Sequence, residues 1–179
     1  NKEWRAVPKG ISVVIGCSTF PTWNSVTGIY GSLVTGNSVI VKPHPGAILP
    51  MAIFVTEIQK ILAENNLDPN ICQLAVDTFD KMITKELAEH PDVKLIDFTA
   101  NSAFGSYLEN LPGKAVFTEK TGVNSVMLDS AEDIDKVAAN LAFALALYSG
   151  QMCTAPQNFY IPADGIKTPS GVVTFDQFA

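Results

Sequence analysis

The sequence contains no long apolar run and few cysteines, and each shortage excludes a class of protein. No apolar stretch reaches the roughly 18–20 residues needed to cross a bilayer, so we expect no membrane insertion. The three cysteines, Cys17, Cys72 and Cys153, are widely spaced and form no C-x-x-C pair. An odd number without such pairs argues against a disulfide framework and a zinc site. We therefore expect free thiols in a reducing compartment and no bound metal.

Positive charge is also scarce. The chain has 12 Lys and Arg residues against 18 Asp and Glu residues, a net charge of -6, and the basic residues form no cluster. Binding to nucleic-acid phosphates needs a concentrated basic face, so we expect a small-molecule partner and no nucleic acid. The opening stretch NKEWRAVPKG has neither the basic nor the apolar region of a secretory signal. The expected location is the cytoplasm.

Six short apolar runs rich in β-branched residues predict strands. Nearly continuous runs of this kind are typical of parallel strands that are covered on both faces. The runs span residues 11–16, 38–43, 71–76, 93–99, 115–119 and 125–129. Helices are expected between the first five runs, at residues 24–36, 50–66, 78–89 and 102–110. This alternation predicts an α/β protein with a doubly wound parallel sheet.

The helix over residues 50–66 has the clearest pattern. Its apolar residues recur at helical spacing while charged residues occupy the opposite side. They are Met51, Phe54, Ile58, Ile61 and Leu62. We expect this helix to pack its apolar side on the sheet.

A second unit is expected to begin near residue 120. A long apolar helix is predicted between Ser130, which has Asp133 three residues later, and Gly150. The first pair resembles a capping box and the glycine is a stop signal. The chain then offers a short strand, NFYIP, and a tail. Because this second unit would be unfinished, we expect the chain to be a fragment of a larger protein.

Cys153 lies between the predicted helix and the predicted strand, within the stretch YSGQMCTAPQNFYIP. A free cysteine is most often a small buried hydrophobe, and Cys72, inside an apolar run, fits that interpretation. Cys153 instead sits among Gly, Gln and Thr, where a side chain can face a cleft. A reactive thiol needs a base or a polarising site. The sequence alone leaves both interpretations of Cys153 open.

Candidate partners for Cys153 lie at the ends of predicted strands, where α/β folds place ligands. Glu119 ends one strand and Lys42 ends another, although either could be a solvated charge. Residues 97–105, DFTANSAFG, would offer backbone N–H groups at a helix N-terminus to an anionic pyrophosphate. No G-x-G-x-x-G fingerprint occurs in the chain.

Four stretches, in this order along the chain, resemble sequence blocks of the aldehyde dehydrogenase superfamily. They are STFPTWNSVTGIYGSLVTGNSVIVKP, HPDVKLIDFTANSAFG, FTEKTGVNSVMLDSAEDID and YSGQMCTAPQNFYIP. Together they cover nearly the whole chain. The resemblance implies a Rossmann-like fold, with residues 1–120 as part of the NAD(P)-binding domain and 121–179 as the beginning of the catalytic domain. It also implies a homo-oligomer in the full-length protein.

The resemblance also implies roles for individual residues. Cys153 resembles the nucleophile that adds to the aldehyde carbonyl, and Glu119 the general base that activates water. The oxyanion would be held by the Cys153 backbone N–H and by a side chain, for which Thr19 and Asn24 are the alternatives. The cofactor would be bound by residues on three strand ends: Ser18, Lys42, Pro43, His44, Thr99, Asn101 and Gly105.

The sequence departs from the family pattern at three of these places. Thr19 stands where the family has an asparagine, and Ala100 where it has a glycine. Pro45 stands where many NAD-preferring members have a glutamate that holds the ribose 2′-OH. The missing carboxylate would no longer repel a 2′-phosphate, so we expect either NAD or NADP, with NADP slightly favoured.

Within the family, GQMCTAPQN and the shortened EKTGVN most resemble the PaaN type of aerobic phenylacetate catabolism. That resemblance implies oxidation of a CoA-linked semialdehyde. Two alternatives stay open: an enzyme that passes the acyl group to CoA, and a cofactor-binding or interaction module without turnover. A cysteine hydrolase is disfavoured, because no signature pairs His44 or His90 with Cys153, and both histidines are expected at the surface.

Overall fold

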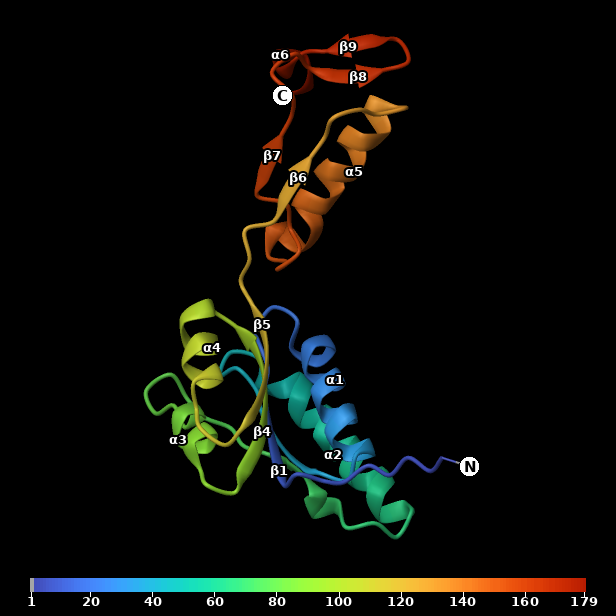
Figure 1. Cartoon of the computed structure of the whole chain (residues 1–179). Helices are drawn as coiled ribbons and strands as arrows, with labels where there is room; N and C mark the ends of the chain where they lie inside the picture. The colour runs from blue at the N-terminus through green and yellow to red at the C-terminus, as the bar shows by residue number, and fades with distance from the viewer. Residues whose placement is uncertain (1) are drawn as a thin grey trace. The chain divides into compact units, whose positions relative to one another are not determined.

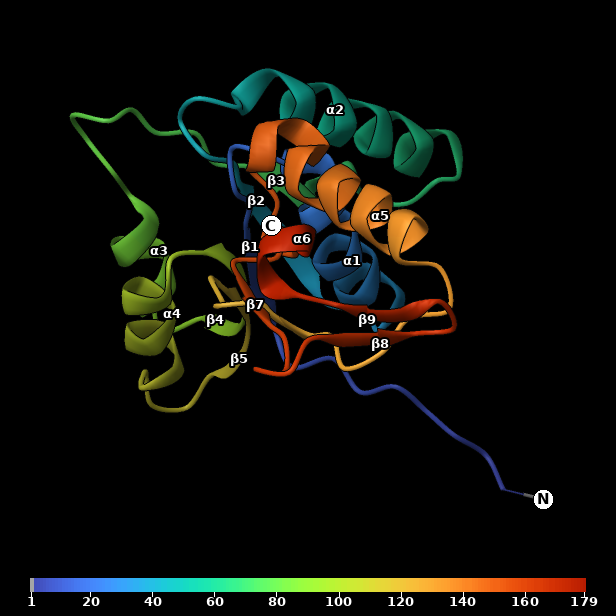
Figure 2. The same ribbon diagram turned by 90° about the horizontal axis from the view of Figure 1, so that it is seen from above.

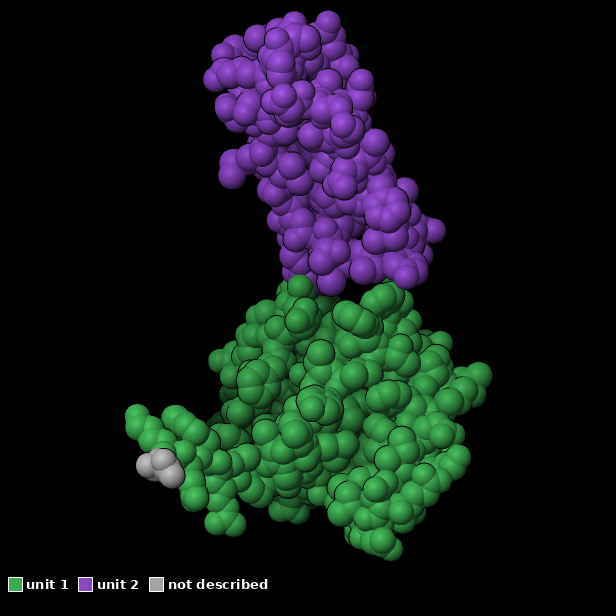
Figure 3. All heavy atoms as spheres, turned by 90° about the vertical axis from the view of Figure 1, so that its right-hand side faces the viewer, with its two compact units in different colours: residues 1–120 green, residues 121–179 purple. Residues whose placement is uncertain are grey.

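The computed structural model describes residues 2–179. The chain divides into two compact units, residues 1–120 and residues 121–179 (Figure 3). Each unit is described by itself.

Unit 1 alternates strands and helices along its whole length (Figure 1). Its strands are β1 (Ile11–Ile15), β2 (Ser38–Lys42), β3 (Cys72–Leu74), β4 (Val93–Ala100) and β5 (Ala115–Lys120). Its helices are α1 (Pro21–Val34), α2 (Ile48–Glu64), α3 (Thr84–Glu89) and α4 (Ser102–Glu109), with a 3-10 turn at Pro69–Ile71.

The five strands form one parallel sheet in the order β3-β2-β1-β4-β5. After β1 the chain builds the sheet outward through β2 and β3, and it then returns to add β4 on the other side of β1. The strand order therefore reverses between β1 and β4. In doubly wound sheets, ligands bind outside the carboxyl ends of the strands at such a reversal.

Helices cover both faces of this sheet (Figure 2). On one face, Val14, Val39 and Val41 pack with residues of α1 and α2. On the other face, Val13 and Ile96 pack with residues of α3 and α4. Side chains that alternate along a strand point to opposite faces, so a strand buried on both sides must be apolar throughout. This is the physical reason for the uninterrupted apolar runs in the sequence.

The predicted α/β class and the parallel sheet are confirmed, and the predicted order of five strands and four helices matches the order in unit 1. Cys72 is fully buried in the core, as expected, and burial raises the pKa of its thiol to about 11. The helix over 50–66 is found as α2, but Ile61 points to solvent with 56% of its surface exposed. The helix over 78–89 is only half present, because Thr78 and Lys81 form a short β-bridge before α3 begins.

Unit 2 contains a strand–helix–strand arrangement followed by a hairpin. Strands β6 (Ser125–Met127) and β7 (Asn158–Tyr160) pair in parallel. Between them lie α5 (Ile134–Ala146) and a 3-10 turn at Leu147–Gly150. Strands β8 (Ile166–Thr168) and β9 (Gly171–Val173) form an antiparallel pair, and the short helix α6 spans Phe175–Phe178.

The strand predicted over 125–129 is found as β6, and it pairs in parallel with β7. Two expectations for the helix of this region need correction. The long helix does not begin at Ser130, because Asp133 is the N-cap and accepts a hydrogen bond from the Lys136 N–H at 3.1 Å. The helix ends at Ala146, four residues before the predicted stop at Gly150. An aspartate side chain is as good an N-cap as a serine, so local sequence could not choose between the two.

Candidate active site

The carboxyl edge of the large sheet is where the predicted cofactor residues of unit 1 gather. Strands β1, β2 and β4 all end at this edge because they run parallel. Each is followed within a few residues by the N-terminus of a helix: α1, α2 and α4, respectively. Helix N-termini present N–H groups and partial positive charge. This edge is therefore suited to an anionic ligand.

Lys42, the last residue of β2, is buried and forms an ion pair that the sequence did not predict. Its Nζ lies 2.7 Å from Oδ1 of Asp77, and the two side chains are 4% and 0% exposed. Oδ2 of Asp77 accepts a hydrogen bond from the Ile83 N–H at 3.2 Å. Oδ1 contacts the ammonium but makes no hydrogen bond. The strand-end lysine is thus neutralised by a carboxylate from the loop that follows β3.

The residues after Lys42 form a tight turn that leads into α2. Pro43 is buried, and the His44 carbonyl accepts a hydrogen bond from the Ala47 N–H at 2.9 Å. The His44 ring accepts another from the Gly46 N–H at 3.0 Å and packs edge-on against Phe79. His44 therefore stabilises the turn. His90, whose side chain is 55% exposed, lies at the surface as predicted.

The loop between β1 and α1 carries Ser18 and Thr19, both exposed. The Cys17 sulfur lies 3.8 Å from the Thr19 hydroxyl. Asn24, the alternative oxyanion residue, lies in the first turns of α1 and its carbonyl accepts a hydrogen bond from the Thr27 hydroxyl at 3.5 Å. Both alternatives lie in the loop after β1 or the first turns of α1.

Thr99 and Asn101 stand at the end of β4. Thr99 is buried, whereas Asn101 is exposed and caps α4 by accepting a hydrogen bond from the Phe104 N–H at 2.9 Å. Gly105 lies one turn further along, under the stem of Lys120. A Cβ atom at Gly105 would lie 2.7 Å from the Lys120 Cδ, so a larger residue here would have to displace the Lys120 side chain. Lys120 is in turn held by an ion pair with Glu109 at 2.8 Å.

Glu119 is exposed on β5, directly beside Thr99 of β4. Asp97 lies two residues before Thr99 on the same face of β4, where it senses the charge of Glu119. Burial, and secondarily the charge of Glu119, raise the pKa of Asp97 from 3.8 to about 6. Sequence inspection did not single out Asp97, although a carboxylate inside an apolar strand run is the signal that could have found it.

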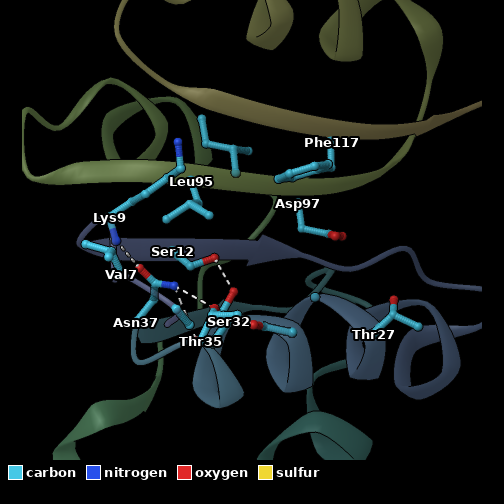
Figure 4. Close-up of a pocket in the computed structure, with 14 residues that line it drawn as sticks. Val7, Lys9, Ser12, Thr27, Ser32, Thr35, Asn37, Leu95, Asp97 and Phe117 are labelled. Carbon is cyan, nitrogen blue, oxygen red and sulfur yellow. Dashed lines mark hydrogen bonds between the residues drawn. The ribbon is translucent and has the colours of Figure 1, made fainter. Parts of the chain in front are cut away.

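Asp97 lies against α1 at a position that only glycine permits. A Cβ atom at Gly28 would lie 2.7 Å from the Asp97 Cγ. The carboxylate also faces a cavity of about 460 Å³ between α1 and strands β1, β4 and β5, shown in Figure 4. The cavity wall includes Leu95 and Phe117, whereas none of the site residues predicted from the sequence lines it. Within residues 2–179, the Asp97 carboxylate has no hydrogen bond or ion pair.

In unit 2, Cys153 is exposed and occupies a turn. The turn is closed by a hydrogen bond from the Ala155 N–H to the Met152 carbonyl at 3.1 Å, which places Cys153 at its second position. Among the described residues, no group of the chain accepts a hydrogen bond from the Cys153 N–H. An exposed sulfur with an unpaired N–H on the same residue is what a nucleophile that also binds an oxyanion requires.

Asn124 holds this turn, and the sequence analysis did not identify it. Its side-chain amide donates hydrogen bonds to the Cys153 carbonyl at 2.6 Å and to the Ala155 carbonyl at 3.1 Å. No local signal marks an asparagine for contacts with residues 29 and 31 positions later. Shortly before the turn, the three consecutive residues Tyr148, Ser149 and Gly150 have positive φ angles.

The carboxyl edge of unit 1 fits a dinucleotide cofactor. The N-terminus of α2 has no side-chain cap, so its N–H groups are open to an anion. Residues at the ends of β2 and β4 would hold the cofactor there. In the described residues there is no group of three or more potential metal ligands, and no helix is long and apolar enough to span a membrane.

The fold and the site define a class: an α/β protein whose parallel sheet has a carboxyl edge suited to an anionic ligand, with an exposed cysteine on the following unit. Residues 2–168 match the model of the aldehyde dehydrogenase family. The chain belongs to the aldehyde dehydrogenase family.

Individual relatives agree with this assignment. An NAD-dependent aldehyde dehydrogenase from Burkholderia multivorans is 51% identical, with a TM-score of 0.90 over 96% of this chain and 31% of that chain. A propionaldehyde dehydrogenase from Rhodopseudomonas palustris with bound propionyl-CoA is 26% identical, with a TM-score of 0.76 over 87% of this chain and 34% of that chain.

A curated relative is also similar in sequence. A putative aldehyde dehydrogenase family 7 member A1 homolog from Caenorhabditis elegans is 30% identical over 89% of this chain and 30% of its own length. The chain thus spans about 30% of the length of the curated relatives that it matches.

Replacing Asp97 with Asn should change how stability depends on pH. Because the folded state raises the pKa of Asp97 from 3.8 to about 6, ionisation costs more in the folded state than in the unfolded state. The resulting stability is present below pH 4 and is lost as pH rises through about 6. In urea unfolding, Asp97→Asn should therefore gain stability relative to the unmodified chain between pH 4 and pH 8, by about 1–2 kcal/mol after allowance for solvent screening.

The control is Asp80→Asn, which removes an exposed carboxylate of the same unit. Its effect on the free energy of unfolding should be the same at both pH values. An Asp97→Asn variant whose stability relative to the unmodified chain does not change with pH would contradict the assignment of this buried carboxyl.

Proposed function

We propose that the protein containing this chain is an NAD(P)-dependent aldehyde dehydrogenase whose nucleophile is Cys153. The observation that carries the proposal is the turn of Met152–Ala155, which exposes the Cys153 sulfur and leaves its N–H without a partner in the described chain. Residues 1–120 would be part of the NAD(P)-binding domain and residues 121–179 the beginning of the catalytic domain. Family membership and the nucleotide-suited edge of unit 1 support both assignments.

The first step is addition of the Cys153 thiolate to the aldehyde carbonyl carbon. A C–S bond forms, and the carbonyl oxygen gains the negative charge. The free Cys153 N–H would stabilise that oxyanion together with Thr19 or Asn24, a contribution whose loss typically costs about 10²–10³ in rate. When bound, NAD(P)⁺ supplies the acceptor for the hydride that leaves the same carbon. The oxidised acyl group then stays on Cys153 as a thioester.

The second step is hydrolysis of this thioester. Glu119 would take a proton from a water molecule, whose oxygen attacks the acyl carbon. The C–S bond breaks, the acid leaves, and the Cys153 thiolate is restored. The exposure of Glu119 at the end of β5 supports this role, because water can reach the carboxylate.

Lys42, Thr99, Asn101 and Gly105 are the residues that we propose bind the cofactor, with Ser18, Pro43 and His44 at the same edge. Two positions near the cofactor edge have opposite effects on the choice of cofactor. Pro45 lacks the carboxylate that would repel a 2′-phosphate, which favours NADP. Asp77 places a carboxylate 2.7 Å from the Lys42 ammonium, which favours NAD. We propose that both cofactors are accepted and that Asp77 limits the preference for NADP.

The proposed substrate is a CoA-linked semialdehyde of phenylacetate catabolism. The support is the sequence of the nucleophile block GQMCTAPQN and the short connection EKTGVN, which resemble the PaaN type. We also propose a homo-oligomer in the cytoplasm, as the family resemblance implies.

An alternative is transfer of the acyl group to CoA in place of hydrolysis. The observation that favours it is the similarity to the propionaldehyde dehydrogenase with bound propionyl-CoA. In that reaction the CoA thiol, and not water, attacks the thioester, so Glu119 would contribute little.

Incubating the whole protein with an aldehyde and NAD(P) should place an acyl adduct on Cys153 and none on the buried Cys72, as measured by mass spectrometry. Glu119→Gln should slow hydrolysis of this adduct by about 10²–10⁴, because the water then lacks a base. Unchanged turnover in the presence of CoA would instead establish the acyl-transfer alternative. A wild-type protein without any adduct on Cys153 would indicate a module without turnover.

Replacing Asp77 with Asn should improve binding of NADP relative to NAD by about tenfold, or about 1.4 kcal/mol. The Lys42 ammonium would then be free to pair with a 2′-phosphate. Dissociation constants measured by cofactor fluorescence, with thermal unfolding as a check on folding, would test this expectation. The control Asp80→Asn, at an exposed position nearby, should leave the ratio of the NADP and NAD dissociation constants unchanged. If Asp77→Asn also left this ratio unchanged, Asp77 would have only a structural role.

Steady-state rates should distinguish the proposed substrate. A CoA-linked semialdehyde should have a kcat/KM at least about tenfold above that of the same aldehyde without CoA, since recognition of the CoA part adds binding energy in the transition state. Equal values for the two aldehydes would exclude the phenylacetate-type substrate while leaving the aldehyde dehydrogenase proposal intact.

A further inference from the structure

Asn124 connects the start of unit 2 to the segment that carries Cys153. Its side-chain amide has two hydrogens, and the amide nitrogen donates to two carbonyls, those of Cys153 at 2.6 Å and Ala155 at 3.1 Å. These carbonyls lie on either side of Thr154. One side chain therefore fixes the orientation of two peptide groups within the turn.

The backbone of Asn124 adds two more contacts to the same segment. Its carbonyl accepts hydrogen bonds from the Gln157 N–H at 2.9 Å and from the Asn158 N–H at 3.2 Å. Asn158 is the first residue of β7, which pairs with β6 immediately after Asn124. The Asn124 backbone thus ties the residues that follow the Cys153 turn to the start of the β6–β7 pair.

The turn needs such a support because little else holds it. Cys153 and Thr154 are exposed, and only Ala155 and Pro156 of this segment are buried. Exposed segments with few apolar contacts are mobile unless hydrogen bonds restrain them. The peptide orientations on the two sides of the Cys153 Cα set the direction of both its N–H and its Cα–Cβ bond. Asn124 holds the peptide after Cys153 through the Cys153 carbonyl, and the bond from the Ala155 N–H to the Met152 carbonyl holds the peptide before it. Together these contacts restrain the two groups on which nucleophilic addition depends.

If Asn124 only stabilised the fold, losing its hydrogen bonds would have a small effect. The hydrogen bond to Cys153 is exposed to solvent, and water could replace the donor, so the net contribution to folding would be about 1 kcal/mol. A comparable tether is available nearby: the Gln157 side-chain amide donates to the Gly122 carbonyl at 3.1 Å. That bond joins the same two segments without contacting Cys153 or Ala155.

We propose that Asn124 is the positioning residue of the nucleophile, holding the Cys153 turn so that sulfur and backbone N–H meet the same carbonyl group. The inference rests on the proposed function, since it assumes that Cys153 attacks an aldehyde. It concerns a residue that acts through Cys153 and does not itself touch the substrate.

The test compares two reactions of Cys153 in the whole protein. Formation of the acyl adduct from an aldehyde and NAD(P) needs both the sulfur and the oxyanion N–H, whereas alkylation by iodoacetamide needs only an accessible thiolate. Asn124→Ala should slow the aldehyde reaction about 10- to 100-fold. Its alkylation rate at Cys153 should change by less than about threefold.

Gln157→Ala is the matched control, because it removes a tether between the same segments and spares the Cys153 carbonyl. It should leave both reactions within about threefold of the wild type. Asn124→Asp, which keeps the shape of the side chain but loses both donors, serves as a second variant. It should reproduce the slow aldehyde reaction, with circular dichroism confirming that each variant is folded.

The outcomes separate this inference from the proposed function. A wild-type protein that forms no adduct with the aldehyde would overturn the proposed function. A wild-type protein that forms it, with Asn124→Ala and Asn124→Asp equally fast, would overturn the positioning role alone. Equal slowing by Asn124→Ala and Gln157→Ala would also overturn it, because any tether between the segments would then suffice.

Discussion

Parallel pairing of β1 with both β2 and β4 is the constraint on which unit 1 depends. This pairing places β1, the first strand, in the middle of the sheet, with β2 and β3 on one side of it and β4 and β5 on the other. Because all five strands run parallel, their carboxyl ends share one edge. Lys42, Thr99 and Glu119 stand at this edge on three different strands. Lys42 and Glu119 are 77 positions apart in the chain, because helices connect the successive parallel strands. The proposed cofactor edge is a consequence of this pairing.

Unit 1 contains both a paired and an unpaired ionisable side chain in its interior. Lys42 and Asp77 are both buried, and each compensates the other's charge. Burial of one partner without the other would be strongly destabilising. Asp97 is a carboxylate without a cation beside it, and burial together with the charge of Glu119 shifts its pKa upward. With a pKa of about 6, the Asp97 carboxyl titrates just below neutral pH, which makes the stability of unit 1 depend on pH in that range.

In unit 2, hydrogen bonds fix the segment that carries Cys153. The conformation around Cys153 is set by polar contacts from Asn124 and by the turn bond from Ala155 to Met152. Polar contacts are directional, so they can hold a sulfur in one orientation without covering it. An apolar core would hold the sulfur equally well but would hide it from substrate.

The sequence by itself determined the α/β class, the order of the strands and helices in unit 1 and the buried state of Cys72, because apolar periodicity reports burial directly. It also identified Cys153, Glu119 and Lys42 as candidates, through residue types at strand and helix ends. Tertiary structure alone decided that Lys42 pairs with Asp77, that the charge of Glu119 acts on Asp97 and that Asn124 holds the Cys153 turn. These contacts join residues far apart in the chain, and local patterns carry no information about partners that only folding brings together.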